Sequence, residues 1–428
     1  MVASLAALFL GSALIGEGRR VAGFTLRRHH LALILAAVLV AAGCLPPSRI
    51  LGYLEPDVLG LVYLMSIVTG YMEVSGLADL VASRVSRLSG RRAVFSIIMA
   101  AGALSLILEN VSVVYLFAPL ALRVAEALGV DPVVTVVGAA LASEMSGSAT
   151  MIGDPPAIIT AGFLNLNFMD FIVYRGRPSM FFYTVAAMLV ASTLITLAYV
   201  RGAERRAGGG GVLEASVDKV FLAEVLFFVS VKIVLLSLRD SINIPLTLAA
   251  LTAVAGITCT RLLLHRDARS VREALARHDI ETPLFLAGVF IISGAFVETG
   301  LASRVANLLL WISRGDPLRL SLLLVAVSML ASAVIYNTPY VAAMLPVVVE
   351  LAHRLGIDPV VLAWALLIGA TLGGTLTYIG AMANYAAVRY LESRGYPVGF
   401  KRFAKVSVPF TLVSVVVGTG LYLLSYHP

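Results

Sequence analysis

The sequence carries the same polar interruption twice, each time inside a stretch that is otherwise apolar enough to cross a membrane. The first copy is GSATMIGDPPA (147–157), and the second is GTLTYIGAMAN (374–384). Glycine and proline break helices, and non-helical backbone at membrane depth persists only where it is buried in protein or lines a polar cavity. The two interruptions therefore restrict the chain to folds in which broken helices are enclosed within a membrane protein.

The interruptions belong to a longer internal repeat with a constant spacing. ALGVDPVV around Asp131 resembles RLGIDPVV around Asp358, and these two aspartates are 227 residues apart. The same spacing pairs Asn110 with Asn337. Matched Asn, Asp-Pro, Gly and Thr in one gap-free register are not expected from an apolar composition alone. We interpret the two segments as copies of one structural module.

The composition places both copies in a membrane. Of the 428 residues, 59% are hydrophobic and 13% are charged, whereas soluble proteins carry about 25% charged residues. We expect about 11–14 membrane segments, counting half-helices and hairpins. The net charge of +7 is explained by arginines in cytoplasmic loops, so no nucleic-acid partner is expected. Cys44 and Cys259 indicate neither a disulfide framework nor a metal site.

The basic residues predict the topology. They gather in four segments, at 19–28, 201–219, 261–277 and 389–405. These segments alternate correctly if all four are cytoplasmic, with the C-terminus outside. The first copy then follows a non-cytoplasmic loop and the second follows a cytoplasmic one. We therefore predict an all-α polytopic protein of the plasma membrane, built from two inverted-topology repeats with broken helices and re-entrant hairpins.

The repeat and the loops divide the chain into five regions. We predict N-terminal membrane helices, a first transporter repeat, a cytoplasmic Gly-rich linker, connecting helices and a second transporter repeat. In chain order these regions span residues 1–50, 51–200, 201–217, 218–262 and 263–428.

Two unwound loops that meet near the midplane would form a binding site for a solute. Half-helix N-termini suit anions, and unwound carbonyls and C-terminal ends suit cations. The predicted substrate- or ion-binding residues are polar or helix-breaking residues of the two copies: Asn110, Ser112, Ser146, Gly147, Ser148, Thr150, Gly153, Asn337, Thr338, Gly374, Thr375, Thr377, Gly380 and Asn384. Such clusters can also mark only kinks or close helix packing. The matched pair of loops favours the transport site.

Ionisable residues inside the membrane are candidates for coupling to a proton or ion. Asp154 and Glu109 are the first choices, and Glu144 is a further one because it precedes the first loop. Lys232, in the middle of an apolar run, is expected to snorkel or to pair with a carboxylate outside the site. Tyr336 stands opposite Glu109 in the repeat and is expected to be an aromatic packing residue.

The motifs ENVSVVYLFAPL, SGSATMIGDPPAIITAG, YNTPYVAAMLPVV and GATLGGTLTYIGAMANYAAV resemble the paired signatures of the ion transporter superfamily. The resemblance is greatest to its branch of arsenite permeases (ArsB), NhaD-type sodium/proton antiporters and the P protein. It covers most of residues 55–425. Ala157 replaces an Asn that is usual after the Pro-Pro pair, and Tyr336 replaces an acidic residue, which weakens the case for classical sodium coordination.

The resemblance implies a secondary active transporter that moves a small inorganic ion or oxyanion, coupled to protons or sodium, by alternating access. Arsenite or antimonite efflux is the leading interpretation, although neither cysteine lies near the motifs. Sodium/proton antiport, di- or tricarboxylate carriage and a passive anion channel are the alternatives. Neither an enzyme activity nor a cofactor is expected. The expected partners are the solute, the coupling proton or sodium and the lipid bilayer; a homodimer is left open.

Overall fold

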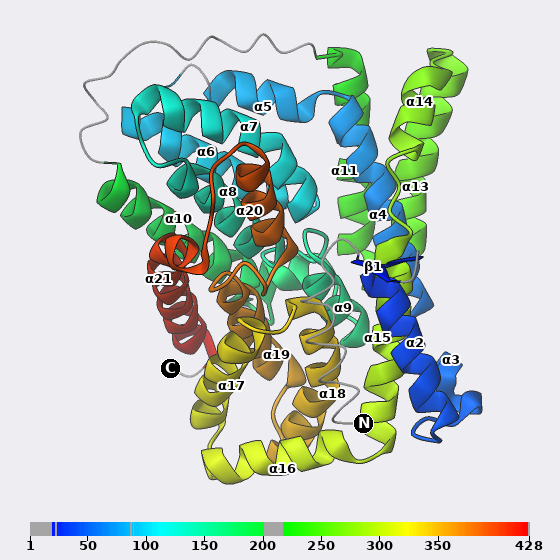
Figure 1. Cartoon of the computed structure of the whole chain (residues 1–428). Helices are drawn as coiled ribbons and strands as arrows, with labels where there is room; N and C mark the ends of the chain where they lie inside the picture. Colours follow the sequence, from blue (N-terminus) through cyan, green and yellow to red (C-terminus); the bar gives the residue numbers. More distant parts are fainter. Residues whose placement is uncertain (1–18, 22–23, 86–87, 89, 201–216, 427–428) are drawn as a thin grey trace.

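The computed structural model describes residues 19–21, 24–85, 88, 90–200 and 217–426. Residues 1–18 of the predicted N-terminal region and 201–216 of the predicted linker lie outside this part. The described chain is almost entirely helical (Figure 1). Its short non-helical and single-turn elements are β1 (Arg19–Val21), β2 (Phe24–Leu26), η1 (Pro47–Arg49), α3 (Ile50–Tyr53), η2 (Met169–Phe171), β3 (Val173–Tyr174), β4 (Arg177–Pro178) and α12 (Arg239–Ile242).

The longer helices fall into three groups along the chain. The first group is α2 (Arg28–Ala41), α4 (Pro56–Val74), α5 (Leu77–Val85), α6 (Gly90–Ser105), α7 (Asn110–Leu128), α8 (Pro132–Gly147), α9 (Pro155–Phe163) and α10 (Met180–Tyr199). The connecting group is α11 (Lys219–Ser237), α13 (Leu246–Cys259), the π-helical turn η4 (Thr260–Leu264) and α14 (Ala268–Leu275). The last group is α15 (Glu281–Glu298), α16 (Leu301–Ser313), α17 (Pro317–Ser332), α18 (Asn337–Leu355), α19 (Pro359–Leu367), the π-helical turn η5 (Ile368–Leu372), α20 (Met382–Ser393) and α21 (Phe400–Tyr426).

The described part of the chain contains seven helices long and apolar enough to cross a membrane, or eight if α16 and α17, which meet at a bend of 119°, form one span. Helices α2, α8 and α19 with η5 are also apolar but have only 10–17 residues. The larger number expected from the sequence included half-helices, and these short helices are of that kind. The protein is therefore a multi-pass, all-α membrane protein, as predicted.

The helices reproduce the repeat that the sequence indicates. Helices α6 and α17 begin and end 227 residues apart, and so do α7 and α18. Helices α8 and α9 begin 227 residues before α19 and α20. Figure 1 shows α5 lying across one end of the molecule, whereas α16, which holds the matching place in the second copy, lies across the opposite end. The two copies thus have inverted topologies.

Matching residues begin and end the repeated helices. Asp131 accepts a hydrogen bond from the backbone N–H of Val133, and Asp358 accepts one from Val360, so both aspartates cap helix N-termini. A proline follows each aspartate at the first helical position, where no N–H is required. The preceding helices end at Gly129 (φ 64°) and Gly356 (φ 65°), both left-handed.

The second arm of each hairpin packs on the other repeat. Helix α9 packs on α18, and α20 packs on α7 and α8. A neighbouring layer contains α4 packed against α13 and α14, and α15 packed against α2 (Figure 1). The interface between this layer and the repeats is where α4 approaches α9 and α15 approaches α18. The two hairpins are therefore held between both repeats and the neighbouring layer.

Candidate functional site

The two interruptions have the same local structure. The Thr150 hydroxyl donates to the carbonyl of Leu106 at 2.7 Å, and the Thr377 hydroxyl donates to the carbonyl of Ala333 at 2.5 Å. These four residues are pairs in the 227-residue register. Gly153 permits a close backbone approach, since a Cβ there would lie 2.6 Å from the carbonyl oxygen of Gly147. The equivalent approach occurs at the second glycine of the other loop. Buried side chain-to-backbone bonds thus stabilise both interruptions.

A single carboxylate joins the two repeats at the hairpins. Glu144, on α8, is 3% exposed. Its Oε1 accepts a hydrogen bond from the side-chain amide of Asn337 at 2.7 Å, and its Oε2 accepts one from the amide of Asn110 at 3.2 Å. Asn110 in turn accepts from the hydroxyl of Ser105. Both repeat-related asparagines therefore bind one acidic group, which comes from the first repeat.

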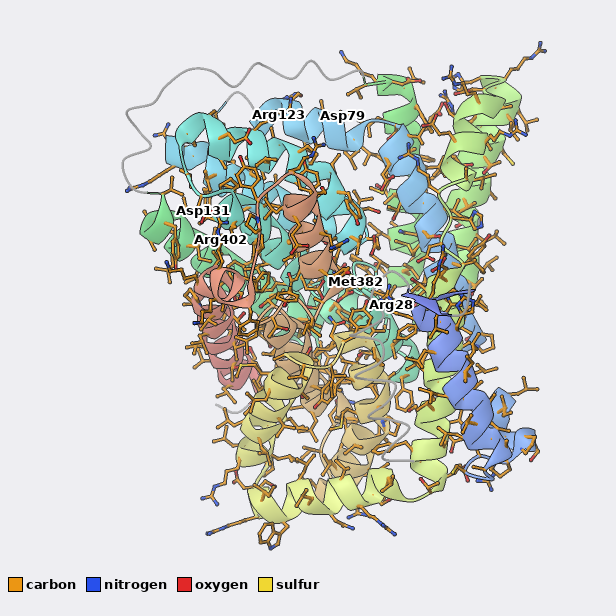
Figure 2. The ribbon with its side chains drawn as sticks, in the orientation of Figure 1. Arg28, Asp79, Arg123, Asp131, Met382 and Arg402 are labelled. Carbon is orange, nitrogen blue, oxygen red and sulfur yellow. The ribbon has the colours of Figure 1, made fainter. Side chains whose placement is uncertain are left out.

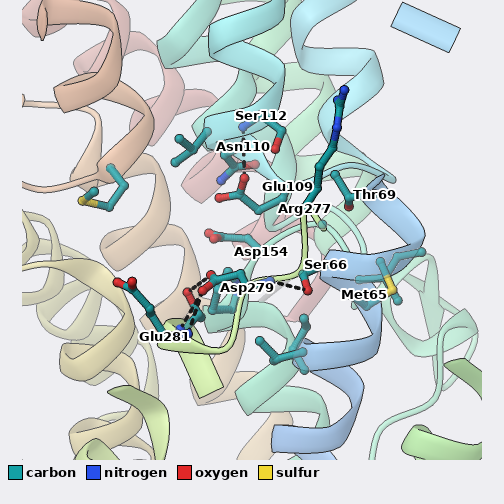
Figure 3. A pocket seen from close by; sticks show the side chains of 18 of the residues that line it. Met65, Ser66, Thr69, Glu109, Asn110, Ser112, Asp154, Arg277, Asp279 and Glu281 are labelled. Atoms are coloured by element: carbon teal, nitrogen blue, oxygen red, sulfur yellow. Dashed lines mark hydrogen bonds between the residues drawn. The ribbon is translucent and has the colours of Figure 1, made fainter. Parts of the chain in front are cut away.

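A cavity of about 500 Å³ lies beside these hairpins, between α4 and α7 (Figure 3). It receives six of the predicted site residues: Glu109, Asn110, Ser112, Glu144, Gly153 and Asp154. The Glu109 carboxylate accepts from the backbone N–H of Ser112 at 3.0 Å, and the residue is exposed toward the cavity. Figure 3 shows the carboxylates of Glu109 and Asp154 pointing into one space. The first repeat thus supplies an acidic wall.

Asp154 is the residue most exceptional in its hydrogen bonding. It precedes α9 in extended conformation, and its side chain makes no capping bond to that helix. It is 4% exposed, and its Oδ2 has no hydrogen-bond partner among the described residues. A buried polar atom without a partner costs free energy. A proton, cation or polar solute in the cavity would supply the missing partner.

The other predicted residues lie in the walls behind the cavity, with one exception. Thr338 lines a small side pocket of about 80 Å³ beside the main cavity. Asn384 donates to the carbonyls of Gly374 and Thr377, which stabilises the second loop. The residues within the walls or hairpins are Ser146, Gly147, Ser148, Thr150, Asn337, Gly374, Thr375, Thr377, Gly380 and Asn384.

Charged residues from outside the motifs also line the cavity, and sequence analysis assigned them to loops. Arg27 and Arg28 come from the start of α2, and Arg277, Asp279 and Glu281 come from the chain between α14 and α15. The assignment of the two N-terminal arginines to a loop is wrong for the second of them, which is the first residue of a helix. No local pattern marks these residues, because only the packing of α2 and α15 brings them to the cavity.

Lys232 also departs from expectation. It neither snorkels nor forms an ion pair among the described residues, since it is 0% exposed and its ammonium lies 3.0 Å from the sulfur of Met65. Met65 lines the cavity, so Lys232 lies directly behind the cavity wall. An amphipathic reading of the side chain missed this position, because the helix is apolar around its whole circumference.

The comparisons with known proteins agree with this architecture. The CitMHS family model, described as citrate transporter, matches residues 13–266 and 233–427. An uncharacterised transporter of Mycobacterium tuberculosis is 31% identical over 384 residues, which cover 86% of each chain. The human P protein is 27% identical over 92% of this chain and 56% of its own length.

A solved structure shares the fold. The YdaH transporter of Alcanivorax borkumensis, described as having an unusual topology, superposes with a TM-score of 0.60 over 99% of this chain and 96% of that chain. The sequence identity is 19%, so this likeness concerns the fold alone. The resemblance to the ion transporter superfamily is confirmed: the chain belongs to the CitMHS citrate transporter family and is a membrane transporter.

Proposed function

We propose that the protein is a secondary active transporter in which a proton or sodium ion at the first-repeat carboxylates drives the movement of a small ion by alternating access. The observation that carries this proposal is the bridge from Asn110 through Glu144 to Asn337. It places one ionisable group between the two inverted repeats, which are the parts that move against each other in transporters of this architecture.

The bridge gives protonation a mechanical consequence. An ionised carboxylate accepts hydrogen bonds at both oxygens, whereas a protonated one has a hydroxyl oxygen that donates. Each oxygen of Glu144 faces an amide N–H. Protonation would therefore weaken the link to one repeat while leaving the other in place. Asp154, with its unpartnered Oδ2 on the cavity wall, is the second coupling residue that we propose.

Two classes of substrate fit the proposal. A small inorganic ion or oxyanion, with arsenite or antimonite efflux as the leading case, would bind through the Asn, Ser and backbone groups of the hairpins. Thiolate capture of arsenic has no support, since neither Cys44 nor Cys259 lines a described cavity. A di- or tricarboxylate is the second candidate, and the match to the citrate transporter family favours it.

Proteoliposome flux is the direct test. The purified protein would be assayed with arsenite, sodium, phosphate, succinate and citrate under imposed proton or sodium gradients. The proposal expects uphill accumulation or extrusion of one solute that requires a gradient and is lost in Asp154→Asn. The matched control is Asp79→Asn, on α5 and outside the described cavities. Flux that only reaches equilibrium without either gradient would identify a passive channel.

We also propose that the basic loops are cytoplasmic. The positive-inside rule supports this orientation, and Figure 1 shows α14 and the start of α11 at the same end of the molecule. A background without Cys44 and Cys259, with single cysteines added near Arg269 or in α16, would be labelled with a membrane-impermeant thiol reagent in whole cells. Labelling of α16 alone is expected, and labelling near Arg269 alone would reverse the orientation.

A further inference from the structure

Three arginines line the cavity, and they differ in their partners. Arg27 forms an ion pair with Glu281, and Arg277 pairs with Glu73 at 2.7 Å and with a second glutamate at 3.1 Å. In the described ranges, no carboxylate lies within ion-pair distance of Arg28. Arg28 is therefore the cavity arginine whose charge is not already neutralised by a neighbour.

Aromatic rings hold the Arg28 guanidinium. Its Cζ lies 5.4 Å from the centre of the Tyr336 ring and 5.8 Å from the centre of the Phe285 ring. Contacts of this kind use the face of the guanidinium and leave the N–H groups at its edge free to donate. A planar, rigid set of donors on an arginine is suited to carboxylates and oxyanions.

Arg28 lies where the main cavity meets the side pocket. It lines both spaces, and Thr338 and Tyr336 line the side pocket with it. Figure 2 shows Arg28 beside Met382, the first residue of α20, which also lines the main cavity. Arg28 itself belongs to α2, outside both repeats. The neighbouring layer thus reaches across the interface and presents a cation to the hairpins.

The acidic groups of the cavity are placed elsewhere. Glu109 and Asp154 belong to the first repeat, and Tyr336 takes the position of Glu109 in the second. Asp279, the acidic residue nearest in sequence to α15, accepts bonds from the backbone N–H groups of the two residues before and within its start, Glu281 and Thr282. These carboxylates therefore leave the Arg28 charge available to a solute.

We propose that Arg28, held by Phe285 and Tyr336, is the anion-binding residue of the transported solute, while Asp154 and Glu109 take the coupling cation. The solute class is an anion with a carboxylate or oxyanion group. This inference deepens the proposed function and rests on it for the role of the cavity in transport. It separates two charges in one cavity: a solute anion on the second-repeat side and a proton or cation on the first-repeat side.

Equilibrium binding tests the inference without any gradient. Wild-type protein and variants in lipid nanodiscs would be titrated by calorimetry with citrate, succinate, phosphate and sulfate. The first two probes report a carboxylate site, and the last two report an inorganic oxyanion site. Arg28→Gln is expected to raise the Kd of the bound anion at least about tenfold, because charge-assisted hydrogen bonds are lost. Arg28→Lys keeps the charge but not the planar donor set, so a smaller loss is expected.

Arg27→Gln is the matched control. It removes the same charge one residue earlier, from an arginine that is already paired, and its effect on Kd is expected to stay within about twofold. The inference is overturned if Arg28→Gln binds like wild type, if Arg27→Gln loses as much affinity, or if the wild type binds none of the four anions. Should Arg28→Gln fail to fold, an Arg28→Lys variant with wild-type affinity for every probe would also overturn it.

The outcome is separable from that of the flux assay. Loss of anion binding in Arg28→Gln together with gradient-independent flux would contradict coupling and retain the anion site. Gradient-driven flux that Arg28→Gln leaves unchanged would retain coupling and contradict the anion site.

Discussion

The two repeats share their backbone contacts but not their charges. Thr150 and Thr377 bond equivalent carbonyls, and equivalent aspartates cap the helices before the hairpins. At the site, however, the three acidic residues of the first repeat have neutral counterparts. In the 227-residue register, Glu109, Glu144 and Asp154 correspond to Tyr336, Thr371 and Ala381.

This difference indicates which features belong to the module and which belong to its chemistry. The interruptions need the same hydrogen bonds in both copies, because broken backbone inside a membrane must be satisfied wherever it occurs. The ionisable groups are needed only once, because a single site forms where the copies meet. We therefore expect changes in the shared features to act alike in both repeats, and changes in the acidic residues to act through the first repeat alone.

The largest effect is expected from Glu144→Gln. The variant keeps the shape of the side chain but replaces one acceptor oxygen by an NH₂ group, which opposes the amide of Asn110 or Asn337. Gradient-driven flux in proteoliposomes should fall about 100-fold, the factor that corresponds to losing a charged hydrogen-bonding partner. The counterpart Thr371→Val, in the second repeat, should retain most of the flux. Equal losses in the two variants would contradict the division of roles.

Sequence reasoning could reach the shared features because they are local. The Asp-Pro caps, the glycine approach at Gly153 and the position of both interruptions follow from residue types at fixed spacing. The bridge at Glu144 could not be derived, since it depends on the packing of α8 against elements of both repeats. Arg28 was missed for a related reason: basic residues near apolar runs are typical of cytoplasmic loops, and only the contact of α2 with α15 brings Arg28 to the cavity.

The next largest effect is expected from removing either asparagine of the bridge. Asn110→Ala and Asn337→Ala each remove one donor to Glu144, and each should lower flux about tenfold. The two bonds share one carboxylate, so the double variant should lose less or more than the product of the single effects. Multiplicative losses in the double variant would show that the asparagines act independently and that Glu144 does not couple them.

The hydroxyl bonds of the interruptions provide a test of the shared structure. Thr150→Val and Thr377→Val remove equivalent bonds to the carbonyls of Leu106 and Ala333. Each variant should lose about 1–3 kcal/mol of stability, because a buried carbonyl is left without its donor. Thermal unfolding in detergent should show similar decreases in Tm for both. A decrease confined to one variant would mean that the two hairpins are not structurally equivalent.

The smallest effect is expected outside both repeats, at the Asp267–Arg261 ion pair between α13 and α14. The Arg261 guanidinium, together with the backbone N–H of Ser270, holds the pKa of the Asp267 carboxyl below its usual range. A lowered pKa means that the stabilisation is present above the unfolded pKa of about 3.9 and is lost as the pH falls through the folded value. Because the pair is partly solvated, Asp267→Asn should cost less than about 1 kcal/mol at neutral pH.

Three measurements on Asp267→Asn would show whether this connecting region stands apart from the transport site. Its Tm should be slightly below that of the wild type at neutral pH, and the gap should narrow as the pH falls below about 4. Its gradient-driven flux should equal that of the wild type, because Asp267 lines none of the described cavities. A loss of flux as large as that of Glu144→Gln would place the connecting helices within the coupling mechanism, and the contrast between the two repeats would then be insufficient to explain transport.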